Sequence, residues 1–152
     1  MNIEDSEKIE QIIREFFLKT SLSLDLEISP SEENTVLVQI KTEDPRHLIG
    51  QNGQTLTEIQ RLLKIILRRQ IQRDLYVDVD VNNYKKRKIE YLKETAREIA
   101  NEVVLTGKEK TLDPMPSYER RIVHMELAER SGIITESVGQ NLERRIIVKP
   151  VL

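Results

Sequence analysis

Two glycines frame a short polar segment in the first third of the chain. The segment is Leu48-Ile49-Gly50-Gln51-Asn52-Gly53-Gln54-Thr55-Leu56. Glycine has no Cβ atom, so the backbone can turn sharply and a sugar-phosphate strand can come close. Gly53 also precedes an apolar helical pattern, where free backbone N–H groups and the positive end of the helix dipole favour a phosphate. The segment is a candidate phosphate-binding loop. An ordinary helix–loop–helix turn is the alternative, because Gly-x-x-Gly alone is a weak signal.

Basic side chains accompany this segment. Arg46 precedes it, and Arg61, Lys64 and Arg68 follow at spacings of three and four, which puts them on one helix face. A further run, Lys85-Lys86-Arg87-Lys88, stands at a predicted helix start, where the helix dipole disfavours exposed cations by about 0.3–1 kcal/mol each. Anion binding would explain that placement. The alternatives are a solvated polar face for the first set and pairing with Asp78, Asp80 or acidic residues elsewhere for the second.

An arginine and a histidine form a third candidate. Arg120 and His124 are four residues apart in a predicted helix and therefore face the same way. Arginine offers bidentate contacts to phosphate, and histidine can hydrogen-bond a phosphate or stack on a base. A surface pair or a packed histidine is the alternative. The remaining candidate nucleic-acid contacts are Arg121, Arg144 and Arg145.

The distribution of charge favours an anionic partner more than the total does. The chain has 152 residues, of which 33% are charged and 38% hydrophobic, with a net charge of −2. Residues 1–45 carry 4 Lys/Arg and 11 Asp/Glu, residues 46–93 carry 11 and 5, and residues 94–152 carry 9 and 10. The positive charge is thus concentrated in the middle third. Cysteine is absent, which excludes disulfides and thiolate zinc sites.

Hydrophobic spacing predicts the elements that carry these residues. Helices are expected over 5–18, 54–72, 84–106 and 118–130, with Ser117 capping the last, and a short helix after Asp44-Pro45. Strands are expected over 22–28, 35–40, 76–81, 110–112, 133–138 and 144–148. The long helix over 54–72 is expected to turn Leu56, Ile59, Leu62, Leu63, Ile66, Leu67 and Ile71 inward. The predicted fold class is α+β, with a domain boundary at Asn82-Asn83 that gives domains 1–82 and 83–152.

Several motifs in this order resemble a known family. The order helix-strand-strand-helix-GxxG-helix-strand, with Ile-Gly-x-x-Gly-x-x-Leu at its centre, resembles a type II KH domain. Tyr118-Glu119-Arg120-Arg121-Ile122-Val123-His124 resembles the core of the small α/β domain named for its Arg-x-x-x-His motif. Leu112-Asp113-Pro114-Met115 resembles the entry to that core, and residues 135–139 and 144–148 resemble its closing hairpin. A KH domain followed directly by an Arg-x-x-x-His domain is the arrangement of the bacterial Jag/KhpB family.

This resemblance implies single-stranded RNA binding, a cytoplasmic location, a role linked to cell elongation and division, and a small single-KH protein as partner. Two departures qualify it. Family loops often carry a basic residue between the glycines, whereas this loop has Gln51-Asn52, for which Arg46 and Arg61 would compensate. Many members also have an extra N-terminal domain and linker that we do not expect here, so a membrane-proximal role assigned to that domain is not carried over.

Other classes of function are disfavoured. The only histidines are His47 and His124, and no HExxH, GxSxG or Walker pattern is found, so we expect no enzyme, metal site or cofactor. No apolar run reaches 18 residues, and residues 1–10 lack the features of a secretory signal, so no membrane insertion is expected. A protein-interaction adaptor with little nucleic-acid affinity is the serious alternative. Single-stranded DNA also stays open as a ligand, since the sequence reveals no contact to a 2′-hydroxyl.

Overall fold

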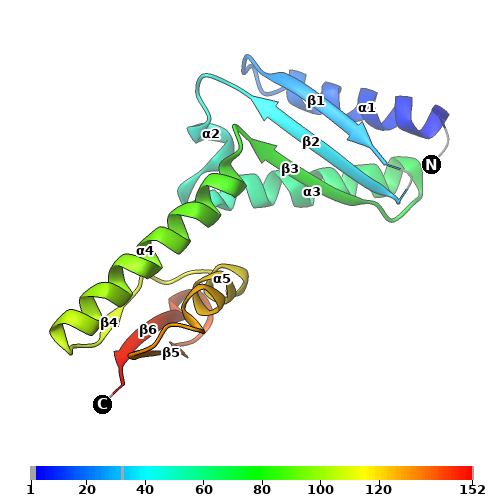
Figure 1. The fold of residues 1–152 in the computed structure, drawn as a ribbon. Helices are drawn as coiled ribbons and strands as arrows, with labels where there is room; N and C mark the ends of the chain where they lie inside the picture. Colours follow the sequence, from blue (N-terminus) through cyan, green and yellow to red (C-terminus); the bar gives the residue numbers. More distant parts are fainter. Residues whose placement is uncertain (1–2, 32, 152) are drawn as a thin grey trace. The chain divides into compact units, whose positions relative to one another are not determined.

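The computed structural model describes residues 3–31 and 33–151, and these form two compact units (Figure 1). The first unit spans Met1–Lys85 and the second Lys86–Leu152. The boundary expected after residue 82 lies three residues before this division. The assignment of the two units as domains stays a prediction.

The first unit combines a three-stranded sheet with helices. Its elements are α1 (Ile3–Leu18), β1 (Asp25–Pro30), β2 (Thr35–Lys41), α2 (Arg46–Ile49), the 3₁₀ turn η1 (Gln51–Gly53), α3 (Gln54–Ile71) and β3 (Tyr76–Val81), followed by α4 (Tyr84–Thr106). The strand order is β1-β2-β3, with β1 antiparallel and β3 parallel to β2. This is the order of elements that the sequence predicts for a KH-like α+β unit.

One face of this sheet carries the core. Val36, Val38 and Ile40 of β2 are buried, whereas Leu37 between them is exposed, because side chains alternate across a strand. Helices α1 and α3 cover the buried face with residues at helical spacing, among them Ile9 and Leu63. The sheet and these two helices therefore fix where the loop between α2 and α3 emerges.

Two details of the first unit differ from the sequence prediction. The first strand was expected over 22–28, but β1 begins at Asp25 because Asp25 pairs with Lys41, the last residue of β2. Leu22 and Leu24 have no strand opposite them and instead pack partly buried against the core. Leu62 was expected to point inward, yet it is 46% exposed. It lies on the flank of α3, beside the buried stripe of Leu56, Leu63 and Leu67.

The second unit packs two helices on a small antiparallel sheet. After most of α4 come β4 (Lys110–Thr111), α5 (Ser117–Leu127), β5 (Ile133–Val138), the turn η2 (Asn141–Glu143) and β6 (Arg145–Pro150). The strand order is β4-β6-β5. Its core joins small residues of α4 with apolar residues of α5 and the strands, including Ala96, Ala100, Val123, Ile146 and Val148.

Ser117 does not cap α5, contrary to the prediction. The helix begins at Ser117 itself, and Pro116 occupies the cap position without a side-chain hydrogen bond. Proline suits this place because the first N–H groups of a helix have no partner within it. The helix also ends at Leu127, three residues before the predicted end, and residues 128 and 129 form a turn that leads to β5.

Candidate nucleic-acid interface

The loop between α2 and α3 depends on three residues with positive φ. These are Gly50 at φ 69°, Asn52 at φ 53° and Gly53 at φ 77°. Positive φ is easy for glycine and is tolerated by asparagine. The tight turn that results leaves Gln51 and Asn52 exposed. A loop that contacts the backbone of a nucleic acid requires this exposure.

The side of each glycine that lacks a Cβ atom faces the protein. A Cβ atom on Gly50 would collide with the Thr55 side chain, and one on Gly53 would lie 3.0 Å from Cε1 of Tyr84. The sequence argument held that the missing Cβ atoms let a nucleic-acid strand approach, but neighbouring side chains fill that space. The glycines therefore set the shape of the loop. Any contact of this loop with a nucleic-acid strand has to come from the exposed protein backbone and from the side chains of Gln51 and Asn52.

Most cations near this loop already have a partner. The Arg46 guanidinium lies 3.5 Å from Asp44, and that of Arg61 lies 3.3 Å from Glu58. Lys64 and Arg68 are exposed further along α3, and neither makes an ion pair within the described residues. The face that the sequence predicts therefore exists on α3, with its uncompensated charge at Lys64 and Arg68.

Lys85 is part of an internal network. Its ammonium group forms an ion pair with Asp78 and donates to Gln60 Oε1 at 3.0 Å. Its backbone N–H donates at 3.2 Å to the buried carboxylate of Asp80, which thereby stabilises the start of α4. Pairing with Asp78 and Asp80, the alternative left open by the sequence, thus describes Lys85. Lys86 and Arg87 are exposed, and the Lys88 ammonium lies 5.8 Å from the centroid of the Tyr91 ring.

In the second unit, α5 and the β5–β6 hairpin bring two arginines to one hydroxyl. Arg120 donates from Nη1 to Ser137 Oγ at 3.0 Å, and Arg144 donates from Nε to the same oxygen at 2.9 Å. Arg144 also donates from Nη1 to the Gly139 carbonyl at 3.2 Å. His124 Nδ1 lies 2.5 Å from Thr135 Oγ1. Thr135 and Ser137 are two residues apart on β5, so both hydroxyls face α5.

The group formed by Arg120, His124, Ser137 and Arg144, called the arginine cluster below, concentrates positive charge without a counterion. Two guanidinium groups each lie about 3 Å from one neutral oxygen. Neither Arg120 nor Arg144 makes an ion pair within the part of the chain described, and Arg120 Nε is buried without an acceptor. An anion bound between the two groups would offset their repulsion and accept charge-assisted hydrogen bonds.

Comparison with known proteins finds relatives that share one name and a domain family that matches the second half of the chain. The chain is 31% identical over 143 residues to "RNA-binding protein KhpB" of Clostridium symbiosum, covering 93% of the chain and 64% of that protein. It is 35% identical over 118 residues to the protein of the same name from Bacillus subtilis (strain 168), covering 76% and 57%. Residues 90–150 match the model of the domain family named for its Arg-x-x-x-His motif.

Nearly the whole chain is thus similar to proteins that carry the KhpB name. These matches confirm the recognition made from the motifs. The Arg-x-x-x-His domain match contains all four side chains of the arginine cluster. The chain spans 64% of the Clostridium symbiosum relative and 47% of the "RNA-binding protein KhpB" of Streptococcus pneumoniae serotype 2 (strain D39).

Within the described residues, no helix is long and apolar enough to cross a membrane.

Arg145 lies apart from the arginine cluster. Ser137 pairs with Ile146, which is buried, so the side chain of Arg145 points to the opposite face of the sheet. Arg145 forms an ion pair of 3.0 Å with Glu143. Lys149 is likewise paired, at 2.6 Å from Glu136, and this hydrogen-bonded carboxylate raises the pKa of Lys149. Adjacent arginines in the sequence thus have different surroundings.

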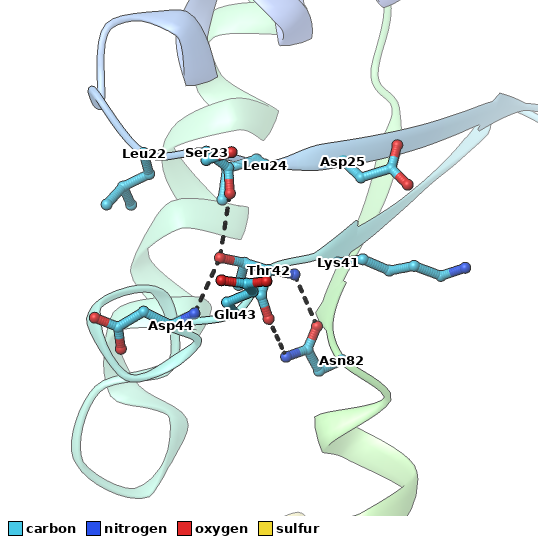
Figure 2. Close-up of a pocket in the computed structure, with 9 residues that line it drawn as sticks. All are labelled: Leu22, Ser23, Leu24, Asp25, Lys41, Thr42, Glu43, Asp44 and Asn82. Atoms are coloured by element: carbon cyan, nitrogen blue, oxygen red, sulfur yellow. Dashed lines mark hydrogen bonds between the residues drawn. The ribbon is translucent and has the colours of Figure 1, made fainter.

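A cavity of about 750 Å³ in the first unit does not fit a polyanion (Figure 2). Thr42 lies at its centre, held by Asn82 through two hydrogen bonds of 3.0 and 2.8 Å. Its lining contains the carboxylates of Asp25, Glu43 and Asp44 but only one cation, Lys41. Phosphate groups would be repelled here, so this cavity is not a candidate for the nucleic-acid interface.

Sequence reasoning missed the acceptors that organise the arginine cluster. Ser137 joins residues 17 and 7 positions away, and Thr135 contacts a histidine 11 positions away. Two hydroxyl residues at alternate positions of a predicted strand were the available signal. Nothing in the sequence indicated that they would face Arg120 and His124.

Proposed function

We propose that this chain binds single-stranded RNA and that the arginine cluster supplies its main phosphate contact. The observation that carries the proposal is the pair of guanidinium groups on Ser137, which lack a carboxylate partner within the described chain. A phosphodiester is an anion with two free oxygens and suits two arginines at once. His124, one helical turn from Arg120, adds a donor or a stacking surface.

The loop at Gln51-Asn52 is proposed as a second contact, extended along α3 by Lys64 and Arg68. Its support is the exposed tight turn and the uncompensated charge on the adjoining helix. The cations proposed to assist are Arg46, Arg61, Lys86, Arg87, Lys88 and Arg121. Because neither Gln51 nor Asn52 is basic, we expect this loop to contribute less affinity than the arginine cluster.

The wider role is proposed from the family. The relatives are named RNA-binding proteins, and we extend that activity to this chain. We also propose a cytoplasmic regulator linked to cell elongation and division, with a small single-KH protein as partner. These finer statements rest on the resemblance to the Jag/KhpB family alone.

The proposal can be tested by titrating labelled single-stranded RNA and DNA of matched sequence. The wild type and the variants Arg120→Ala/Arg144→Ala and Gln51→Asp/Asn52→Asp are compared at low and physiological salt. Binding should weaken steeply with salt, as expected for released counterions, and both variants should lose affinity. Circular dichroism of each variant confirms that the fold is intact.

No binding of either nucleic acid by folded wild type would overturn the proposal. The adaptor alternative would then become the working hypothesis. A preference for DNA over RNA at equal salt would retain the two surfaces but reassign the ligand.

A further inference from the structure

One face of α5 exposes large side chains beside the arginine cluster. Tyr118 is 60% exposed and Met125 is 64% exposed. Arg121 lies between them in sequence, three residues after Tyr118 and four before Met125, so the three share one side of the helix. Arg121 is also exposed and has no ion pair within the described residues.

The apolar packing of α5 comes from other side chains. Val123 and Leu127 supply the buried side of the helix, and Glu119 is also buried there. Tyr118 donates from its hydroxyl to Glu119 Oε1 at 3.2 Å, which holds the polar end of the side chain near the helix surface. A tyrosine and a methionine of this size lose apolar burial by remaining in solvent. Their placement therefore favours a binding role.

We propose that Tyr118, Arg121 and Met125 form a stacking platform for a nucleobase of the strand whose phosphate lies between Arg120 and Arg144. This inference rests on the proposed RNA binding and adds the part of the ligand that the arginine cluster does not contact. An aromatic ring and a guanidinium plane both stack on unpaired bases, and the methionine sulfur is polarizable. Arg120 and Arg121 are neighbours, so one helix presents the phosphate contact and the base contact side by side. The positive charge of Arg121 matches a polyanionic strand.

Tyr91 provides a matched control within the same unit. It is also 60% exposed on a helix, but the Lys88 ammonium already lies over its ring at 5.8 Å. An equal effect of losing either tyrosine would indicate a general loss of surface contacts. A selective effect of Tyr118 would indicate a specific platform.

The test compares a labelled single-stranded RNA of mixed sequence with an abasic oligomer of the same length and sugar-phosphate charge. Tyr118→Ala should lower affinity for the RNA about fivefold or more, the usual range for a lost base stack. It should leave affinity for the abasic oligomer unchanged within twofold. Tyr118→Phe should keep RNA affinity, and Tyr91→Ala should change neither. In Tyr118→Trp, the only tryptophan of the chain should be quenched by RNA and much less by the abasic oligomer.

The outcomes separate the platform from the underlying function. If wild type binds both oligomers equally and Tyr118→Ala matches wild type on both, the platform is wrong while phosphate binding by Arg120 and Arg144 stands. If wild type binds neither oligomer, the proposed function itself fails. Equal losses on the RNA and the abasic oligomer would make Tyr118 a structural residue and would also overturn the platform.

Discussion

The two candidate surfaces differ in the chemistry that they offer to an anion. The loop of the first unit offers exposed backbone, two neutral polar side chains and nearby cations that mostly have carboxylate partners. The arginine cluster of the second unit offers two arginines held on one neutral hydroxyl. A guanidinium fixed before binding loses less side-chain entropy than a solvated lysine. We therefore expect the second unit to dominate phosphate affinity.

This difference also explains why counting basic residues misleads. Residues 46–93 hold more Lys and Arg than residues 94–152, yet Lys85 is neutralised internally and Arg46 and Arg61 have acidic neighbours. Residues 94–152 have no net positive charge, yet within the described chain Arg120 and Arg144 lack a carboxylate partner. The cations of this part that do form ion pairs are Arg97, Lys110, Arg145 and Lys149. Whether a cation can attract an anion therefore depends on whether a neighbouring carboxylate already neutralises its charge.

The largest expected effect is the loss of the shared arginine pair. Arg120→Ala/Arg144→Ala should weaken RNA binding about 150-fold or more, because each arginine loses a charge-assisted hydrogen bond worth about 1.5–3 kcal/mol. Fluorescence anisotropy with labelled RNA measures it. Arg145→Ala is the neighbouring control and should remain within twofold of wild type. Equal losses in both variants would show that unspecific charge, not the Ser137 geometry, carries affinity.

The next effect concerns the free energy of unfolding and is expected in the first unit but not in the second. Gly53→Ala places a side chain at φ 77° and 3.0 Å from the Tyr84 ring, which should destabilise the first unit by about 1–3 kcal/mol. Amide hydrogen exchange should accelerate in α3 and β3 and remain unchanged in β5 and β6. Because Tyr84 packs against the core, the double variant Gly53→Ala/Tyr84→Ala is compared with Tyr84→Ala alone, and Gly53→Ala should cost less stability in that background. No cost in that background would mean that backbone strain contributes nothing.

Charge reversal of the loop should have a moderate effect. Gln51→Asp/Asn52→Asp should weaken RNA binding about tenfold through repulsion of phosphate at short range. The opposite change, Gln51→Lys/Asn52→Lys, should strengthen it in the same titration. If neither variant differs from wild type while Arg120→Ala/Arg144→Ala does, the loop is not a nucleic-acid contact and the chain has one surface instead of two.

Removal of the exposed α3 cations should have a smaller effect. Lys64→Ala/Arg68→Ala should lower affinity a few-fold and reduce the slope of log affinity against log salt by about 1–2. Titrations at several salt concentrations measure that slope. Arg73→Ala is a suitable control because Arg73 is paired with Asp5 at 3.1 Å. An unchanged slope in the double variant would remove this face from the interface.

The smallest effect is expected at the Lys149–Glu136 pair, outside the proposed surfaces. Because Glu136 raises the folded-state pKa of Lys149 above 10.5, the pair stabilises the fold at neutral pH and is lost only as the pH rises through that raised value. Glu136→Gln should lower the melting temperature by less than about 2 °C at pH 7, as for other exposed pairs. RNA affinity should not change. A large loss of affinity would mean that the open face of this sheet also binds RNA.

The sequence by itself determined the order of elements and the location of both motifs. Helical and alternating hydrophobic patterns are local, so they predicted α3, α4, β2 and β3 to within one residue at each end. The glycines at positions 50 and 53 and the arginine and histidine at 120 and 124 were visible as types and spacings. The family followed from these motifs in their order.

Only the tertiary structure decided which of those residues act together. Ser137 reaches Arg120 because β5 packs beside α5, and Arg144 reaches Ser137 because the hairpin pairs Ser137 with Ile146. The same pairing turns Arg145 away, and the approach of α4 to β3 neutralises Lys85. Strand pairing and helix packing join residues far apart in the chain, whereas hydrophobic periodicity reports only neighbours a few positions away.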